Sequence, residues 1–221
     1  MYKNRLNHSS AHLFIQATGL VLFLLLSLVL ASTARAAEQP TTFVSRLAQD
    51  ATAIVTDSRM SRGDRQRAFQ QMLHSYFDVS LIGRFVLGRH WRAATPSERT
   101  AFLQTFEAYI LATYGRRLES YAGETLSVSH AQDKGRQGVL VLSTLQSRQG
   151  APMAVVWRLR RDGESWRVFD IVVEGVSLIM THRSEIDTVL RQSGDFEGLL
   201  ESLRAMVARV SGPAGVQASK L

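Results

Sequence analysis

The sequence has no cysteine among its 221 residues. Without thiols, the chain can form neither a disulfide framework nor a thiolate metal site, and it lacks the cysteine that carries the lipid of a bacterial lipoprotein. It also lacks a glycine-rich loop for phosphates and the HExxH pattern of a helical zinc site. We therefore expect no metal and no cofactor, and a fold that is stabilised by packing alone.

Acidic residues are absent from the first 36 positions, where Lys3, Arg5 and Arg35 are the basic ones. An apolar run over residues 19–31 and the small residues in Ala34-Arg35-Ala36 complete the pattern of a secretory signal. We expect cleavage after Ala36, a mature protein that begins at Ala37, and a periplasmic location. The alternative is an uncleaved inner-membrane anchor over residues 13–31, which is close to the about 20 residues that span a bilayer.

Charge of one sign is only slightly in excess once this segment is removed. Taking its three basic residues from the 26 in the chain leaves 23 against 19 acidic residues, a net charge of +4. This weak, scattered charge argues against a nucleic-acid partner and suits transient contact with an anionic membrane or an acidic protein. The chain is 45% hydrophobic, enough for one domain with a substantial core.

The first part of that domain reads as helical. Apolar side chains recur at helical spacing over residues 41–58, after Ser61, and between Asp78 and Gly88. Thr95-Pro96-Ser97-Glu98 is a capping box with proline at the first helical position, and it predicts a long helix that reaches about residue 121. Two more helices, at 181–191 and 195–210, are expected to close a domain spanning 37–210, before a flexible tail at 211–221.

Between these helices lie four expected strands, at 125–131, 139–145, 153–160 and 168–173. The last two flank Arg161-Asp162-Gly163-Glu164, in which Asp-Gly predicts a tight hairpin turn. Residues 139–145 and 168–173 are almost entirely apolar, so both faces of these strands must be covered. The order predicts an α+β fold: N-terminal helices, a four-stranded antiparallel meander, and C-terminal helices.

Several stretches resemble one family. Residues 166–186 read WRVFDIVVEGVSLIMTHRSEI, residues 87–96 read LGRHWRAATP, residues 113–115 read TYG, and residues 194–203 read GDFEGLLESL. In this order they resemble the MlaC-type, or toluene-tolerance auxiliary, proteins, which are periplasmic phospholipid carriers. The resemblance implies an NTF2-like cone with a curved sheet, and an apolar cavity that holds acyl chains.

That resemblance also implies partners and a set of lining residues. The partners would be an inner-membrane MCE/ABC transporter complex and an outer-membrane lipoprotein complex, between which a monomer shuttles lipid. Each proposed lining residue has an ordinary alternative as dry core. The candidates are Phe85, Trp91, Phe106, Ile110 and Tyr114 from the helices, and Val139, Val141, Met153, Val155 and Trp157 from the sheet.

Other functions stay open at this point. Ile186 and His182-Arg183 depart from the family pattern, and a polycyclic lipid such as a hopanoid is an alternative ligand. Asp170, Glu174 and His182 lie close in sequence and could support acid–base chemistry in an NTF2-like cavity. For Asp170 the simpler interpretation is a structural acid that pairs with Arg158 or Arg183, or that caps the next helix. A protein-interaction module with a filled core is a third class.

Overall fold

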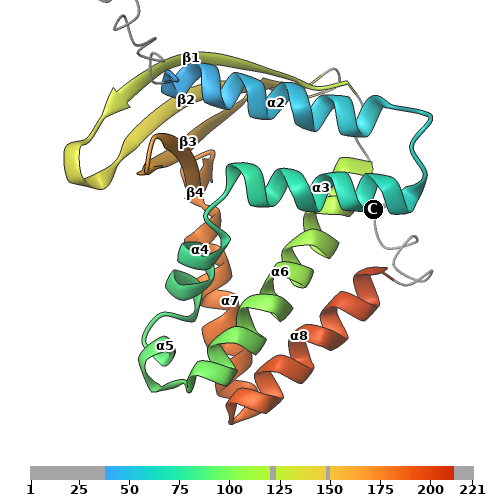
Figure 1. Ribbon diagram of the computed structural model, residues 1–221, viewed down its shortest axis with the longest axis vertical. Coiled ribbons are helices and arrows are strands. Elements are labelled where there is room, and N and C mark those ends of the chain that lie inside the picture. The colour runs from blue at the N-terminus through green and yellow to red at the C-terminus, as the bar shows by residue number, and fades with distance from the viewer. Residues whose placement is uncertain (1–37, 120–122, 148–149, 212–221) are drawn as a thin grey trace, which may run out of the picture. The chain divides into compact units, whose positions relative to one another are not determined.

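The computed structural model describes residues 38–119, 123–147 and 150–211 (Figure 1). The expected signal segment and nearly all of the expected tail lie outside these ranges and stay predictions. The helices are α2 (Pro40–Thr56), α3 (Arg62–Tyr76), α4 (Val79–Leu87), α5 (His90–Ala93), α6 (Pro96–Glu119), α7 (Leu178–Ser193) and α8 (Phe196–Ser211). The strands are β1 (Thr125–Asp133), β2 (Val139–Gln146), β3 (Met153–Asp162), β4 (Ser165–Val173) and β5 (Val176–Ser177), and a 3₁₀ turn, η1, covers Gly135–Gln137.

Side-chain caps fix where the helices begin. The expected capping box of α6 is present: the Glu98 amide donates to Thr95 Oγ1 at 3.2 Å, and the Thr95 amide donates to Glu98 Oε2 at 2.7 Å. Asp78 caps α4 through the Leu81 amide at 2.9 Å. The expected start of α7 at residue 181 was wrong. Ser177 caps this helix, so α7 begins three residues earlier, at Leu178.

The strands form one antiparallel sheet in the order β1-β2-β3-β4-β5. The α+β class is confirmed, with helices flanking a curved sheet, but the sheet has a fifth strand that the sequence did not reveal (Figure 1). The β3–β4 turn also lies one residue later than expected. Asp162 pairs with Ser165, so Gly163 and Glu164 form the turn, and Gly163 supplies the positive φ of 59°.

The expected exit at Glu174-Gly175 is a second tight hairpin. Both residues have positive φ, 49° and 80°, and the turn pairs Val173 with Val176 to form β5. Among the described residues, Glu174 is the only non-glycine with positive φ. Its amide donates to the Ala154 carbonyl at 3.0 Å and its carboxylate accepts from the Ala154 amide, so two hydrogen bonds to β3 offset the backbone strain.

Two hydrophobic clusters make up the core. In the first, α2 and α3 pack on the sheet, with Phe43, Val44 and Phe69 against Val141 and Leu159. In the second, Leu87, Phe102, Phe106, Ile186 and Leu199 join α4, α6, α7 and α8. Figure 1 shows α2 running along the sheet, and the second group of helices extending away from the β4 side. The space between the two clusters is where the candidate site lies.

Candidate functional site

An apolar cavity of about 320 Å³ opens between the sheet and the helices. This volume lies at the low end of the about 300–1,000 Å³ that is usual for small-molecule pockets. Its wall takes residues from α2, α3, α4, α6, α7, β3 and β4, and so draws on both hydrophobic clusters. The lining residues are Leu47, Ala51, Phe69, Met72, Leu73, Phe77, Val79, Ile82, Phe106, Ile110, Tyr114, Trp157, Phe169, Asp170, Ile171, Leu178, Ile179 and His182.

Four of the ten expected lining residues border this cavity. Phe106, Ile110 and Tyr114 follow one another at intervals of four on α6, so their side chains form one stripe along the wall. Trp157 faces the cavity from β3. Its indole Nε1 donates to Ser143 Oγ at 2.9 Å, which leaves the apolar part of the ring for the wall.

Two expected helical residues lie elsewhere. Phe85 is on the outer side of α4, 39% exposed, beneath the guanidinium of Arg183 at 5.1 Å. Trp91 in α5 lies beneath the guanidinium of Arg99 at 5.4 Å. Phe85 thus faces outward, whereas Trp91 is partly buried and packs against the second hydrophobic cluster, and a cation covers each ring.

The other four sheet residues also lie outside the cavity wall. Val139, Val141 and Val155 are buried in the cluster formed with α2 and α3, and Met153 is 36% exposed at the start of β3. These valines share the inward face of the sheet with Trp157, as their alternation predicted. Because α2 packs directly on β1 and β2, Val139 and Val141 contact the first hydrophobic cluster and not the cavity.

The sequence reasoning missed much of the remaining wall. Phe69, Met72 and Ile82 belong to the helical stripes after Ser61 and between Asp78 and Gly88, and such stripes most often indicate ordinary core. Phe169 and Ile171 come from β4, where the apolar residues on both faces were the available signal. A β-bulge opposite Arg158 and Leu159 inserts an extra residue into β4 beside Asp170, and bulges of this kind redirect side chains.

Asp170 is a buried carboxylate in this otherwise apolar wall. It accepts from Ser177 Oγ at 2.7 Å and from the Ile179 amide at 3.1 Å, and its Oδ2 lies 3.5 Å from Arg158 Nη1. A carboxylate is stabilised by the amides and the positive end of a helix N-terminus. Asp170 therefore joins β4 to the start of α7, with both its helix contacts and its arginine partner in place.

His182 forms the second polar point of the wall. Its Nε2 lies 2.8 Å from the Tyr114 hydroxyl, and its Nδ1 lies 2.9 Å from Glu185 Oε2. The ring packs edge-on against Phe106, Tyr109 and Tyr114. Tyr109 lies beside this ring, and the pKa of its hydroxyl is raised by its own burial and then by the negative charge of Glu185. Both nitrogens of the His182 imidazole are thus engaged, in a polar chain that leads from Tyr114 at the cavity to Glu185 at the surface.

Of the three polar residues that lie close in sequence, Asp170 and His182 line the apolar cavity and Glu174 does not. The Glu174 carboxylate bonds the Ala154 amide in the β4–β5 turn, while Asp170 and His182 each have separate partners. Within the described ranges, no three histidine or carboxylate side chains are grouped so that they could hold a metal ion. The arrangement can enclose an apolar ligand and offer it a few hydrogen-bonding groups.

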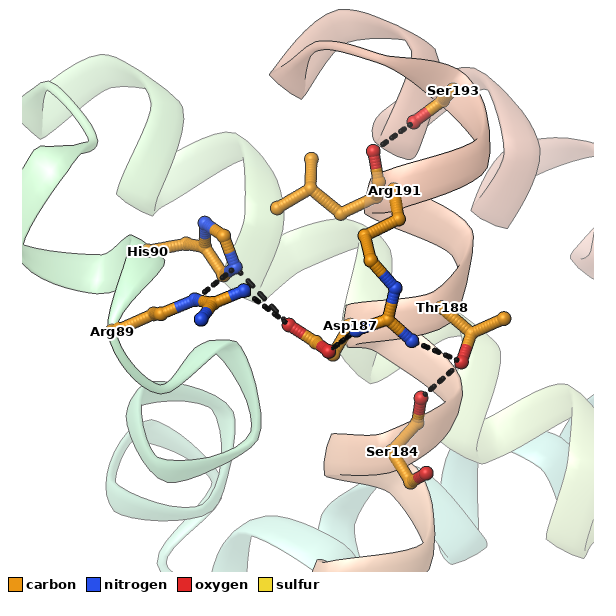
Figure 2. Close-up of polar contacts among 8 residues, drawn as sticks. Arg89, His90, Ser184, Asp187, Thr188, Arg191 and Ser193 are labelled. Carbon is orange, nitrogen blue, oxygen red and sulfur yellow. Dashed lines mark hydrogen bonds and ion pairs between the residues drawn. The ribbon is translucent and has the colours of Figure 1, made fainter.

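A polar network joins α7 to the start of α5 (Figure 2), and none of its charged residues lines the cavity. Asp187 Oδ1 lies 3.3 Å from His90 Nε2 and 3.4 Å from Arg89 Nη2, and its other oxygen pairs with Arg191. The hydrogen bond with His90, and then the charges of Arg191 and Arg89, lower the pKa of Asp187. This network fastens the start of α5 to α7.

Comparison with known proteins identifies the fold's relatives. The profile of the family described as MlaC protein matches residues 45–205. The chain belongs to the MlaC family. Every lining residue of the apolar cavity lies within the matched region.

Individual relatives are distant in sequence. The MlaC binding protein of the intermembrane phospholipid transport system of Haemophilus influenzae is 24% identical over 108 residues, which cover 47% of this chain and half the length of that protein. The toluene tolerance protein ttg2D of Pseudomonas putida is 23% identical over 144 residues, covering 64% of this chain and 67% of the relative.

A solved structure agrees with the fold. The phospholipid-binding protein of Ralstonia solanacearum, solved in complex with a phospholipid, superposes with a TM-score of 0.69 at 22% identity, covering 79% of this chain and all of that one. Separately, none of the helices in the described ranges combines the length and the apolarity needed to cross a membrane.

Proposed function

We propose that this protein is a periplasmic phospholipid carrier that binds acyl chains in the apolar cavity. The observation that carries the proposal is the cavity itself, enclosed by α3, α6, α7 and the sheet and lined almost entirely by apolar side chains. Membership of the MlaC family supports it, as do a relative named for phospholipid transport and a structural neighbour bound to a phospholipid.

Energetics favour a carrier that needs no energy source of its own. Two acyl tails of about 16 carbons gain roughly 25 kcal/mol on leaving water, at about 0.8 kcal/mol per CH₂. The same tails already have this benefit in a bilayer, so transfer from the membrane into an apolar cavity is close to balanced. Such a protein needs a cavity, a way to open it, and docking sites. The relatives are named as binding or tolerance proteins, which fits a function without catalysis.

The division of the core suggests how the cavity opens. One cluster holds α2 and α3 on the sheet, the other holds α4, α6, α7 and α8 together, and the cavity lies between them. A cavity of about 320 Å³ must widen to admit long tails. Movement of one cluster relative to the other widens it while each cluster stays packed, which is the usual character of hinge and shear motions.

Membership of the family supports a proposal about partners. We propose that the protein exchanges lipid with an inner-membrane MCE/ABC transporter complex and an outer-membrane lipoprotein complex. A hopanoid or another polycyclic lipid is the second candidate ligand, because the aromatic rings of Phe69, Phe106 and Trp157 in the wall suit a rigid apolar skeleton as well as a flexible chain.

Native mass spectrometry of the mature protein, purified from its periplasm without detergent, tests the proposal. We expect an adduct whose mass and fragmentation identify a phospholipid. A polycyclic lipid in its place would support the second candidate. Protein that carries no lipid, and that takes up none from phospholipid vesicles, would contradict both.

A further inference from the structure

A second pocket, of about 580 Å³, borders the N-terminal half of α3, whereas the apolar cavity borders its C-terminal half. It is formed where the N-terminal part of α3 meets residues from the C-terminal parts of α2, α6 and α8. Figure 1 shows the C-terminal end of α8 rising toward α3. Phe69 lines both this pocket and the apolar cavity, so its side chain is a wall common to the two.

The lining of this pocket is divided by chemistry. Its polar part contains three arginines, Arg62, Arg65 and Arg116, two glutamines and no carboxylate. Its apolar part includes Ile54, Leu111 and other aliphatic side chains from α2, α6 and α8. The apolar cavity, in contrast, has no arginine in its wall. A cationic side facing an aliphatic side matches a molecule with an anionic head and a hydrocarbon body.

Part of the arginine chemistry has an ordinary structural explanation. Arg65 Nη2 donates to the Asp57 carbonyl at 3.2 Å, and Arg116 Nη1 donates to the Val210 carbonyl at 3.3 Å. These contacts stabilise the C-terminal ends of α2 and α8, where free carbonyls and the negative end of the helix favour a cation.

The helix-end contacts do not explain one donor group of Arg65. Its Nε is buried and has no hydrogen-bond partner among the described residues. A buried donor of a charged group is costly to leave without a partner. Arg65 lines the pocket, and phosphate and carboxylate groups match the fork of donors that arginine presents, so an oxyanion in the pocket is a partner that suits its guanidinium.

We propose that this pocket is a second ligand site, which binds the phosphate or carboxylate head of a single-chain amphiphile through Arg65. The hydrocarbon part of that ligand packs on the aliphatic side formed by α2, α6 and α8. The site goes beyond the proposed lipid carriage, since it is separate from the apolar cavity and does not depend on what the cavity holds. Through Phe69, an occupant of this pocket also touches the wall of the cavity.

Calorimetric titration of delipidated protein with dodecyl phosphate tests this proposal. Arg65→Gln removes the proposed anion contact, and we expect it to weaken binding about tenfold to a hundredfold, as for the loss of a hydrogen bond to a charged group. Gly115→Leu fills the pocket without a change in charge, because a Cβ at Gly115 meets only the Phe69 ring at 3.8 Å, and we expect the same loss. Arg59→Gln is the matched control: Arg59 lies close by in sequence, pairs with Asp57 and does not line the pocket.

Two further ligands distinguish an anionic head group from free inorganic phosphate as the anion that Arg65 binds. Dodecyl maltoside, which has no charge, should not compete for the site that depends on Arg65. Inorganic phosphate that binds as tightly as dodecyl phosphate, with the same dependence on Arg65, would overturn the amphiphile assignment and name the free ion as the ligand. Unchanged binding of dodecyl phosphate by both Arg65→Gln and Gly115→Leu would overturn the site as a whole.

One more variant keeps this test independent of lipid carriage. Ile110→Trp fills the apolar cavity, so it should abolish binding there and leave the dodecyl phosphate site intact. Circular dichroism melts of each variant confirm that the chain is folded before titration. Wild-type protein that fails to bind lipid in the cavity but retains Arg65-dependent binding would contradict the carrier function and support the second site.

Discussion

The α6 wall and the sheet face beneath α2 carry the same kinds of side chain, yet they have different neighbours. Phe106 and Ile110 on α6 border the cavity, whereas Val141 and Val155 on the sheet are buried against α2 and α3. Both sets are apolar, and both lie on inward faces. The difference lies in the neighbours: α2 packs on β1 and β2, whereas α6 and β4 contribute opposite parts of the cavity wall.

This comparison shows that a periodic apolar face predicts burial and does not predict what buries it. A side chain that faces another side chain gains packing contacts, and one that faces a void is free to gain them from a ligand. The same substitution should therefore have opposite consequences in the two regions: loss of stability on the sheet face, and loss of ligand on α6.

The largest loss of stability is expected from Val141→Trp. Val141 is fully buried between the strands and α2, so an indole cannot fit without displacing its neighbours. Overpacking a filled core costs about 1–3 kcal/mol or more, and we expect the upper part of this range. Urea denaturation measures the free energy of unfolding. A variant as stable as the wild type would mean that this face has unfilled space and that the comparison is wrong.

A smaller loss of stability is expected from Asp170→Asn. Asparagine retains an oxygen for the Ile179 amide but loses the charge that pairs with Arg158 and favours the start of α7. We expect the variant to be less stable by about 1–3 kcal/mol, and to bind lipid once folded. Thermal melts and a lipid-uptake assay measure the two properties separately. Full stability with complete loss of lipid binding would favour a direct role of this carboxylate in the cavity.

The network around Asp187 should make the stability of the protein weakly dependent on pH. Because His90, Arg191 and Arg89 lower the folded pKa of Asp187, this carboxylate stabilises the protein above its unfolded pKa, and the benefit is lost as the pH falls through the folded value. Asp187→Asn should remove this contribution, so the stability difference from wild type should shrink on going from pH 7 to acid. A difference that stays constant over that range would contradict the assignment.

A small gain in stability is expected from Gly115→Ala. Gly115 lies on the side of α6 that faces the arginine-lined pocket. A Cβ there meets only Phe69 Cδ1 at 3.8 Å, an ordinary contact. Alanine is the better helix former, and we expect the free energy of unfolding to rise by about 0.4–1 kcal/mol. A decrease would show that α6 needs the smaller residue.

The parts of the fold that could be predicted were those with local signals. The Thr95–Glu98 capping box fixed the start of α6, and its spacing placed Phe106, Ile110 and Tyr114 on one side. Alternation assigned the inward face of the sheet. In each case the information lies within a few consecutive residues, so the sequence alone could carry it.

The rest depends on contacts between distant segments. Which valines α2 would cover, and which wall would stay open, follows from how α2 and α3 lie on the sheet. The fifth strand is two residues long and exists because Glu174 bonds back to Ala154. The arginine-lined pocket gathers its cations from separate helices, so no stretch of sequence shows them as a group.

The most direct test of the central claim is Ile110→Trp on the α6 wall. An indole at this position should take space that an acyl chain needs, while filling a void costs little stability. Native mass spectrometry for bound lipid, combined with the melting temperature of the lipid-free protein, measures both consequences. We predict loss of the co-purified lipid with the melting temperature nearly unchanged. A destabilised variant that retains its lipid would contradict the assignment of this cavity as the lipid site.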